Sequence, residues 1–479
     1  MKRKLLMMAF TLMIFASCSN FLNLQPENQI NDQSFYKSVN DFEAAIVGPY
    51  ANLQDVYNSS YLYLTELTTD NTNVTLQSPG ISELECDEMR FTATNGYISS
   101  IWSSSYNSIS RSNNIITMLE TAQINEQAKS QYKGEALFLR AYNYFNLVRL
   151  FGALPIVEKE FRSPNEVASY DMTRKPESEA YALIVKDLVS AGDLLANVSG
   201  IGKGRASTGA AKALLGKVYL TQKQYDKAAV ELKAVIDMNK YSLVSNYKSL
   251  FSNNNDELAE SIFEIKYLSG SVGEGNSFAL QMVPALYGGM ALFQGNQLGG
   301  GRLSPTTDMA NAYEPGDLRK KISISDSIPL TGGGVYRMLY GLKFVDFLAK
   351  DVTDMDNNFT AIRYADVLLM YAEVLNETGK TTEALVYLNM IRNRAGLTSL
   401  VGLSKSDFSL AIEKERRVEF LYEGQRWFDL VRTGRAITVL NKYFTDNKLS
   451  FTVENYKLLM PIPQREMDID PNLAQNPGY

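Results

Sequence analysis

The sequence predicts a mostly α-helical protein built on tetratricopeptide-like helix hairpins and interrupted by long irregular loops. Three observations support this prediction: amphipathic helical patterns recur along the chain, two segments share one helix-turn-helix spacing, and glycine-rich stretches without a period separate them. The 479 residues are 45% hydrophobic and 21% charged, as in folded globular proteins. We therefore expect a large buried core.

The N-terminus reads as a lipoprotein export signal. Lys2 to Lys4 form a basic head, and the apolar run from Leu5 to Ala16 is too short to span a bilayer. FASC followed by SNFLN looks like a bacterial lipoprotein cleavage site, so residues 1–17 are expected to be removed and Cys18 to be lipidated. Acyl chains on Cys18 would hold the protein on a membrane without a spanning helix. A buried N-terminal helix is the alternative.

Composition excludes several classes of function. The formal charge of −6 disfavours a surface for nucleic acid or for anionic lipid. Histidine is absent, which removes histidine-based nucleophile pairs, imidazole zinc sites and histidine general bases. Cys86 has no internal disulfide partner if Cys18 carries lipid. Carboxylates remain the main catalytic option.

The segment 138–151 is predicted to be a helix that is covered by neighbouring elements on more than one face. Leu137, Ala141, Tyr144, Val148 and Phe151 form one stripe at helical spacing, and a second aromatic stripe lies beside it. Gly152 and Pro155 then end the helix. Its rings are expected to pack against neighbouring helices.

Two segments share the tetratricopeptide spacing. Gly216, Tyr219, Ala228, Leu232 and Val235 follow the pattern, and the same offsets recur at a second place, with Ala372, Leu375, Ala384, Leu388 and Ile391. Small residues twelve positions apart allow the two helices of a hairpin to cross closely. Such hairpins must stack on neighbours to bury their apolar faces.

Further amphipathic helices are expected over Ser105–Thr121, Glu177–Ala196 and Ser406–Glu423. Between the repeats, Tyr267–Ser304 and Ser325–Gly341 are rich in glycine and turn residues. We expect both to be long loops, and long loops on a rigid scaffold usually carry function.

Seven segments in a fixed order, behind the lipoprotein signal, resemble the SusD/RagB family of Bacteroidota outer-membrane lipoproteins. They cover nearly the whole mature chain: FLRAYNYFNLVRLFGALPIV, RASTGAAKALLGKVYL, ESIFEIKY, RYADVLLMYAEVLNETG, LNMIRNRAGL, ERRVEFLYEGQRWFDLVR and LLMPIPQREMDIDPNLAQNPGY. One departure is that Ser19–Asn23 lack the acidic residues often found after the cysteine of surface-exposed members of this phylum.

The resemblance implies a SusD-like α-helical fold over residues 18–479, with an N-terminal part near 18–240 and a RagB/SusD C-terminal part near 260–479. It implies a protein without enzymatic activity that binds oligosaccharides, or sometimes peptides, at the outer membrane facing the cell exterior. It also implies delivery of the ligand to a SusC-like TonB-dependent transporter. The resemblance does not identify the ligand. A carboxylate-based glycan hydrolase and a purely structural envelope subunit are the alternatives.

Other chemical signals are weak. Glu413, Glu415, Arg416, Arg417 and Glu419 are expected to form a solvated, ion-paired helix face. The glycine runs lack phosphate-loop spacing. No cofactor is expected.

The segment DMDNNF from Asp354 begins like a calcium loop. Phe359 and Ala365 depart from that pattern, because they replace the required glycine and the bidentate glutamate. An irregular structural calcium site is the alternative to an ordinary loop.

A neutral-glycan site requires exposed aromatic rings beside amide and carboxylate groups. We expect this site in two regions. The first region is the segment ELTTDNTNV together with the later Trp102, and its candidates are Asp70, Asn71, Asn73 and Trp102, although Trp102 also fits a buried scaffold position. The second region is the loop 267–304, with Phe278, Tyr287 and Phe293, and Tyr336 and Tyr340 approach it from the next loop.

Overall fold

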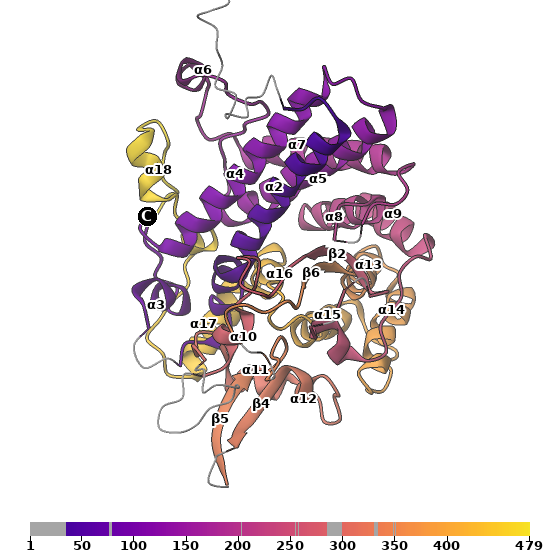
Figure 1. Cartoon of the computed structure of the whole chain (residues 1–479). Coiled ribbons are helices and arrows are strands. Elements are labelled where there is room, and N and C mark those ends of the chain that lie inside the picture. The colour runs from indigo at the N-terminus through magenta and orange to yellow at the C-terminus, as the bar shows by residue number, and fades with distance from the viewer. Residues whose placement is uncertain are drawn as a thin grey trace, which may run out of the picture.

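The computed structural model describes residues 35–75, 79–202, 204–253, 255–256, 258–284, 299–329, 334–347, 349 and 351–479. Within these ranges helices dominate, and the strands are short and arranged in three two-stranded antiparallel sheets. The predicted mostly α-helical fold is confirmed (Figure 1).

The first half of the chain contains long helices that pack together in the upper part of Figure 1, with shorter elements between them. Its elements are α2 (Val39–Asp55), the π-helices η2 (Val56–Ser60) and η3 (Tyr63–Leu67), β1 (Thr72–Asn73), α3 (Ile81–Asp87), α4 (Gly96–Leu119), α5 (Glu126–Phe151), α6 (Pro164–Ser169), α7 (Glu177–Leu195), α8 (Thr208–Thr221) and α9 (Tyr225–Asp237). The expected helix from Ser105 begins earlier, because the Asn95 side chain caps α4 by accepting hydrogen bonds from the backbone N–H groups of Tyr97 and Ile98.

The second half of the chain mixes helices with short strands. Its elements are η4 (Tyr247–Phe251), β2 (Ser261–Ile265), α10 (Phe278–Met282), β3 (Ser304–Pro305), α11 (Thr307–Ala312), α12 (Lys320–Ser323), β4 (Ile324–Pro329), β5 (Val335–Gly341), β6 (Phe359–Arg363), α13 (Tyr364–Glu377), α14 (Thr381–Arg394), α15 (Lys405–Glu419), α16 (Arg426–Arg432), α17 (Ala436–Asp446), η6 (Asn455–Leu458) and α18 (Gln464–Ile469).

The aromatic helix α5 is buried along nearly its whole second half, as its two stripes predict. It packs between α4 and α7. The Phe138 ring meets Phe263 of β2 edge-on at 4.9 Å, and Phe151 meets Trp102 of α4 edge-on at the same distance. Gly152 ends the helix with φ of +72°, a conformation that glycine adopts without steric cost.

Both predicted helix hairpins are present. α8 and α9 form the first, α13 and α14 form the second, and α13 packs against α9. The predicted close crossing is confirmed at Gly216, where an added Cβ would lie 2.7 Å from Cγ of Leu232. The two hairpins therefore stack although a long stretch of chain separates them.

The described residues of the segment 325–341 lie almost entirely in two paired strands, so the expectation of an irregular loop there is wrong. β4 pairs with β5, and the hairpin extends from the lower end of the molecule in Figure 1. Ile328 and Tyr340 face a small core that also contains Ala279, Val283 and Val345. The two strand-forming runs on either side of a glycine cluster were the available hairpin signal.

The charged face of α15 is buried, so the expectation of a solvated face is wrong. Glu415, Arg416 and Glu419 are nearly inaccessible to solvent. Cations from distant segments cover them, and the resulting buried network joins Arg319, Lys343, Arg363, Arg392 and Arg394 to Glu260, Glu415, Glu419 and Glu423. Helical spacing reveals a charged face but does not reveal what packs on it.

Candidate ligand-binding surface

The structure brings together the two segments that the sequence predicts for ligand binding. β1 pairs with β3, with Thr72 opposite Pro305 and Asn73 opposite Ser304. Thr75 continues the contact: its backbone N–H donates to the Gly301 carbonyl at 2.9 Å, and its hydroxyl lies 2.6 Å from that of Ser304. We call Asn73–Thr75, Gly299–Ser304 and the β4–β5 hairpin the loop surface, because β3 also lies against β5.

The loop surface offers polar groups and one exposed ring. Asn73 and Arg302 are half-buried, and Thr75 is exposed. The Tyr336 side chain on β5 is 47% exposed. Amide and hydroxyl groups can hydrogen-bond to a polyhydroxylated ligand, and an accessible aromatic ring can stack on its C–H faces.

Asp70 and Asn71 are structural residues, so their prediction as ligand contacts is wrong. The Asp70 carboxylate accepts two hydrogen bonds from Arg426, both at 2.9 Å. Burial opposes its ionisation, but Arg426 and Arg417 outweigh burial and lower the pKa of Asp70 to about 2. The Asn71 side chain donates to Glu66 and accepts from Arg417. These contacts fix the chain just before β1.

Phe278 and Tyr340 are core residues, so their prediction as exposed platforms is also wrong. Phe278 is fully buried against Tyr267, Phe344 and Phe359. Tyr340 is 3% exposed, and its hydroxyl donates to the Ser327 carbonyl. Composition could not separate these rings from Tyr336, because all three occur in glycine-rich sequence.

Three predicted residues lie outside the described residues. Tyr287 and Phe293 fall within 285–298, and Cys18 falls within 1–34. Their roles stay predictions.

Trp102 does not join the loop surface. Its side chain is 4% exposed and lines a separate cleft with Tyr106, Tyr170, Asp470 and Asn472. The sequence did not predict this cleft. The available signal was the i, i+4 spacing of Trp102 and Tyr106, which puts both rings on one helix face.

Two carboxyl groups near the loop surface titrate close to neutral pH. Burial raises the pKa of Glu66 and that of Asp87 to about 7. Asp87 accepts a hydrogen bond from the Val74 backbone at 3.2 Å, and Glu66 accepts one from the Gly424 backbone. Glu66 is completely buried, so it cannot reach a glycosidic bond as a hydrolase requires.

The acidic segment after Asp354 holds a neighbouring turn. Asp354 accepts hydrogen bonds from the backbone N–H groups of Gly270 and Ser271 at 2.9 and 2.7 Å, and Asp356 accepts one from the Ser269 hydroxyl. Among the described residues, no group of three or more acidic or cysteine side chains could hold a metal ion. A calcium ion at this segment stays a prediction.

Within the described ranges, no helix combines the length and apolar character that crossing a membrane requires.

Comparisons with known proteins agree with the fold. A family model described as "Starch-binding associating with outer membrane" matches residues 20–220, and the SusD family model matches residues 321–479. SusD-like protein P2 of Formosa agariphila is 28% identical over the whole of both chains. A SusD-like protein of Bacteroides ovatus is 28% identical, over 91% of this chain and 83% of its own.

Two solved structures are similar over almost the whole chain. A laminarin-binding SusD-like protein has a TM-score of 0.80 and 28% identity, covering 93% of this chain and 100% of its own. Surface glycan-binding protein A from Bacteroides fluxus has a TM-score of 0.80 and 27% identity, covering 92% and 99%.

Proposed function

Because the chain belongs to the SusD/RagB family, we propose that it captures oligosaccharides on the loop surface and delivers them to a partner transporter in the outer membrane. The likeness to two glycan-binding proteins, each with a TM-score of 0.80, carries this proposal. The pairing of β1 with β3 adds support, because it joins two segments suited to binding sugars.

The chemistry of the loop surface suits binding rather than turnover. Tyr336 offers a ring face to the C–H groups of a sugar, and Asn73 and Thr75 offer hydrogen bonds to its hydroxyls. The nearby Glu66 is enclosed and engaged with Gly424 and Asn71, so it serves the scaffold.

The test is calorimetric titration of the protein with laminarihexaose, maltoheptaose, cellohexaose and xylohexaose. At least one should bind, and Tyr336→Ala should weaken that binding about tenfold through loss of stacking, at little cost in melting temperature because the ring is 47% exposed. Tyr336→Phe is the matched control, since it keeps the ring and should keep most of the affinity.

The same samples separate the alternatives. Steady production of new reducing ends would mean a hydrolase. Binding of peptides in place of every oligosaccharide would mean a peptide-binding lid, and no binding of either would favour a structural subunit.

Delivery implies a physical complex with a SusC-like TonB-dependent transporter. The protein should co-purify with such a barrel in mild detergent, through an interface well above about 1,000 Å² if it acts as a lid. Isolation as a free lipoprotein under those conditions would contradict delivery.

Anchoring is expected through lipid on Cys18, with the folded part at the cell exterior. Cys18→Ala should release the protein from membranes without changing its melting temperature, because the core does not depend on the lipid. Cys86→Ala is the control: it changes the other of the two cysteines and should leave the protein with the membrane. The measurement is the amount of each variant in the membrane fraction of a strain that lacks the transporter. A Cys18→Ala protein that stays in this fraction would contradict anchoring through lipid on Cys18.

A further inference from the structure

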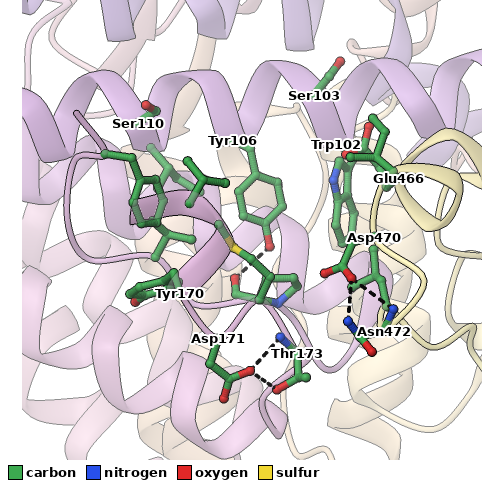
Figure 2. Close-up of a pocket in the computed structure, with 18 of the residues that line it drawn as sticks. Trp102, Ser103, Tyr106, Ser110, Tyr170, Asp171, Thr173, Glu466, Asp470 and Asn472 are labelled. Atoms are coloured by element: carbon green, nitrogen blue, oxygen red, sulfur yellow. Dashed lines mark hydrogen bonds between the residues drawn. The ribbon is translucent and has the colours of Figure 1, made fainter. Parts of the chain in front are cut away.

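A cleft of about 810 Å³ lies away from the loop surface. Its walls come from three parts of the chain: α4, the segment 155–173 that includes α6, and the C-terminal segment 465–473 that includes α18 (Figure 2). This volume is within the range of about 300 to 1,000 Å³ that is typical of small-molecule sites. None of its lining residues belongs to the loop surface.

One side of the cleft is a fixed aromatic wall. Trp102 and Tyr106 extend side by side from α4, with ring centroids 5.0 Å apart (Figure 2). The Tyr106 hydroxyl donates to the Pro155 carbonyl at 2.8 Å, and the Tyr170 hydroxyl donates to the Ile156 carbonyl at 3.0 Å. Phe161 meets Tyr170 edge-on. Because their hydroxyl ends are tied to one backbone segment, the two tyrosine rings lose little entropy when a ligand stacks on them.

The other side of the cleft is polar. Asp470 lines the cleft and accepts two hydrogen bonds on one carboxylate oxygen from Asn472, at 3.0 Å from the backbone N–H and 3.1 Å from the side-chain amide (Figure 2). Among the described residues, no hydrogen bond to the second oxygen of Asp470 is formed. A carboxylate acceptor next to an amide is a suitable pair for adjacent hydroxyl groups of a sugar.

The charged groups that line the cleft balance once Asp171 is counted with its own partner Lys175, and this balance suits an uncharged ligand. Asp171, Glu466 and Asp470 face it against the two cations Lys159 and Arg465. Asp171 is already paired with Lys175 and with Thr173. Exposed apolar side chains, Val167 on α6 and Ile469 on α18, flank these groups.

We propose that this cleft is a second oligosaccharide-binding site, with Tyr106 and Tyr170 as stacking platforms and Asp470 and Asn472 as hydrogen-bonding partners. The ligand class is the uncharged oligosaccharide, because flat rings next to a carboxylate–amide pair match a sugar's C–H face and hydroxyl rim. Two sites on one chain would let it hold a long glycan at two points and so raise its avidity for the polymer.

The two tryptophans of the chain provide a direct readout. Trp102 lines the cleft, whereas Trp427 on α16 is completely buried and is not among the lining residues. Labelling with 5-fluorotryptophan should give two ¹⁹F NMR resonances, assigned with Trp102→Phe. Titration with laminarihexaose, maltoheptaose, cellohexaose or xylohexaose should shift the Trp102 resonance and leave the Trp427 resonance as an internal reference.

Variants of the cleft and of the loop surface separate the two sites. Tyr170→Ala and Asn472→Ala should each weaken the titration of the Trp102 resonance at least tenfold while the Trp427 resonance shows the fold intact. Tyr336→Ala should leave the Trp102 titration unchanged.

Three results would overturn the second site: no Trp102 response to any of the four oligosaccharides at millimolar concentration, a response unaffected by both cleft variants, or a response abolished by Tyr336→Ala. The proposed function has its own readout, the calorimetric effect of Tyr336→Ala. Suppose that the cleft variants remove the Trp102 response and that Tyr336→Ala has no effect in calorimetry. These two results together would support a binding site in the cleft and contradict a binding site on the loop surface.

Discussion

We expect Arg363→Ala to lower the free energy of unfolding by about 3 to 5 kcal/mol, the cost of breaking a buried ion pair by removing one partner. Arg363 is 1% exposed and donates to three carboxylates: Glu260 at 2.8 Å, Glu419 at 2.6 Å and Glu423 at 2.7 Å. The variant would leave these carboxylates buried with fewer cations. Urea denaturation of both proteins at neutral pH measures the difference.

Arg337→Ala is the matched control. Arg337 also pairs with a carboxylate, that of Asp326, but the two side chains are 72% and 70% exposed. Exposed pairs contribute little to stability, so this variant should unfold like the wild type. A similar small effect of Arg363→Ala would mean that water enters the network and that these charges are not buried in solution.

The network also has a predicted pH dependence. Burial alone would raise the pKa of Glu419, but Arg394, Arg363 and Arg319 outweigh burial and hold it well below the ordinary value of 4.5. A carboxyl whose pKa is lowered by folding stabilises the protein above its unfolded pKa and loses that contribution as the pH falls. The deficit of Arg363→Ala relative to wild type should therefore shrink in acid.

The helices could be predicted because burial of one face leaves a periodic pattern in the chain itself. The aromatic stripes of α5 and the small residues of the two hairpins are local signals, and the structure confirms them. Burial of Glu415 and Glu419 depends instead on Arg319, Arg363 and Arg394, which come from other parts of the sequence. Such partners leave no mark on the spacing within α15.

The candidate site was predictable as segments but not as residues. Long glycine-rich stretches and the amide-rich ELTTDNTNV mark loops, and β1 and β3 do lie side by side. The strands are only two residues long, too short for any alternation, so the side on which each group lies could not be inferred. Asp70 lies just before β1, and its role could not be inferred because its partner, Arg426, comes from a distant part of the sequence.

Gly216→Ala tests whether the hairpins need a small residue at their crossing, and we expect it to lower the free energy of unfolding by about 1 to 3 kcal/mol. An added Cβ would lie 2.7 Å from both Cγ and Cδ2 of Leu232, which must then shift within a fully buried contact. Gly192→Ala is the matched control, since Gly192 is also buried inside a helix, α7, but its Cβ would meet only Ala211, at 3.9 Å.

The two alanine variants should differ in stability, with a loss at Gly216 only. Alanine is favoured over glycine inside a helix by about 1 kcal/mol, so Gly192→Ala should be neutral or stabilising. The same gain in helix propensity applies at Gly216. A net fall in the free energy of unfolding of Gly216→Ala would therefore measure the cost of forcing α8 and α9 apart. If both variants gain stability in urea denaturation, the crossing has room for a methyl group, and the small residues at these positions do not set the distance between the helices.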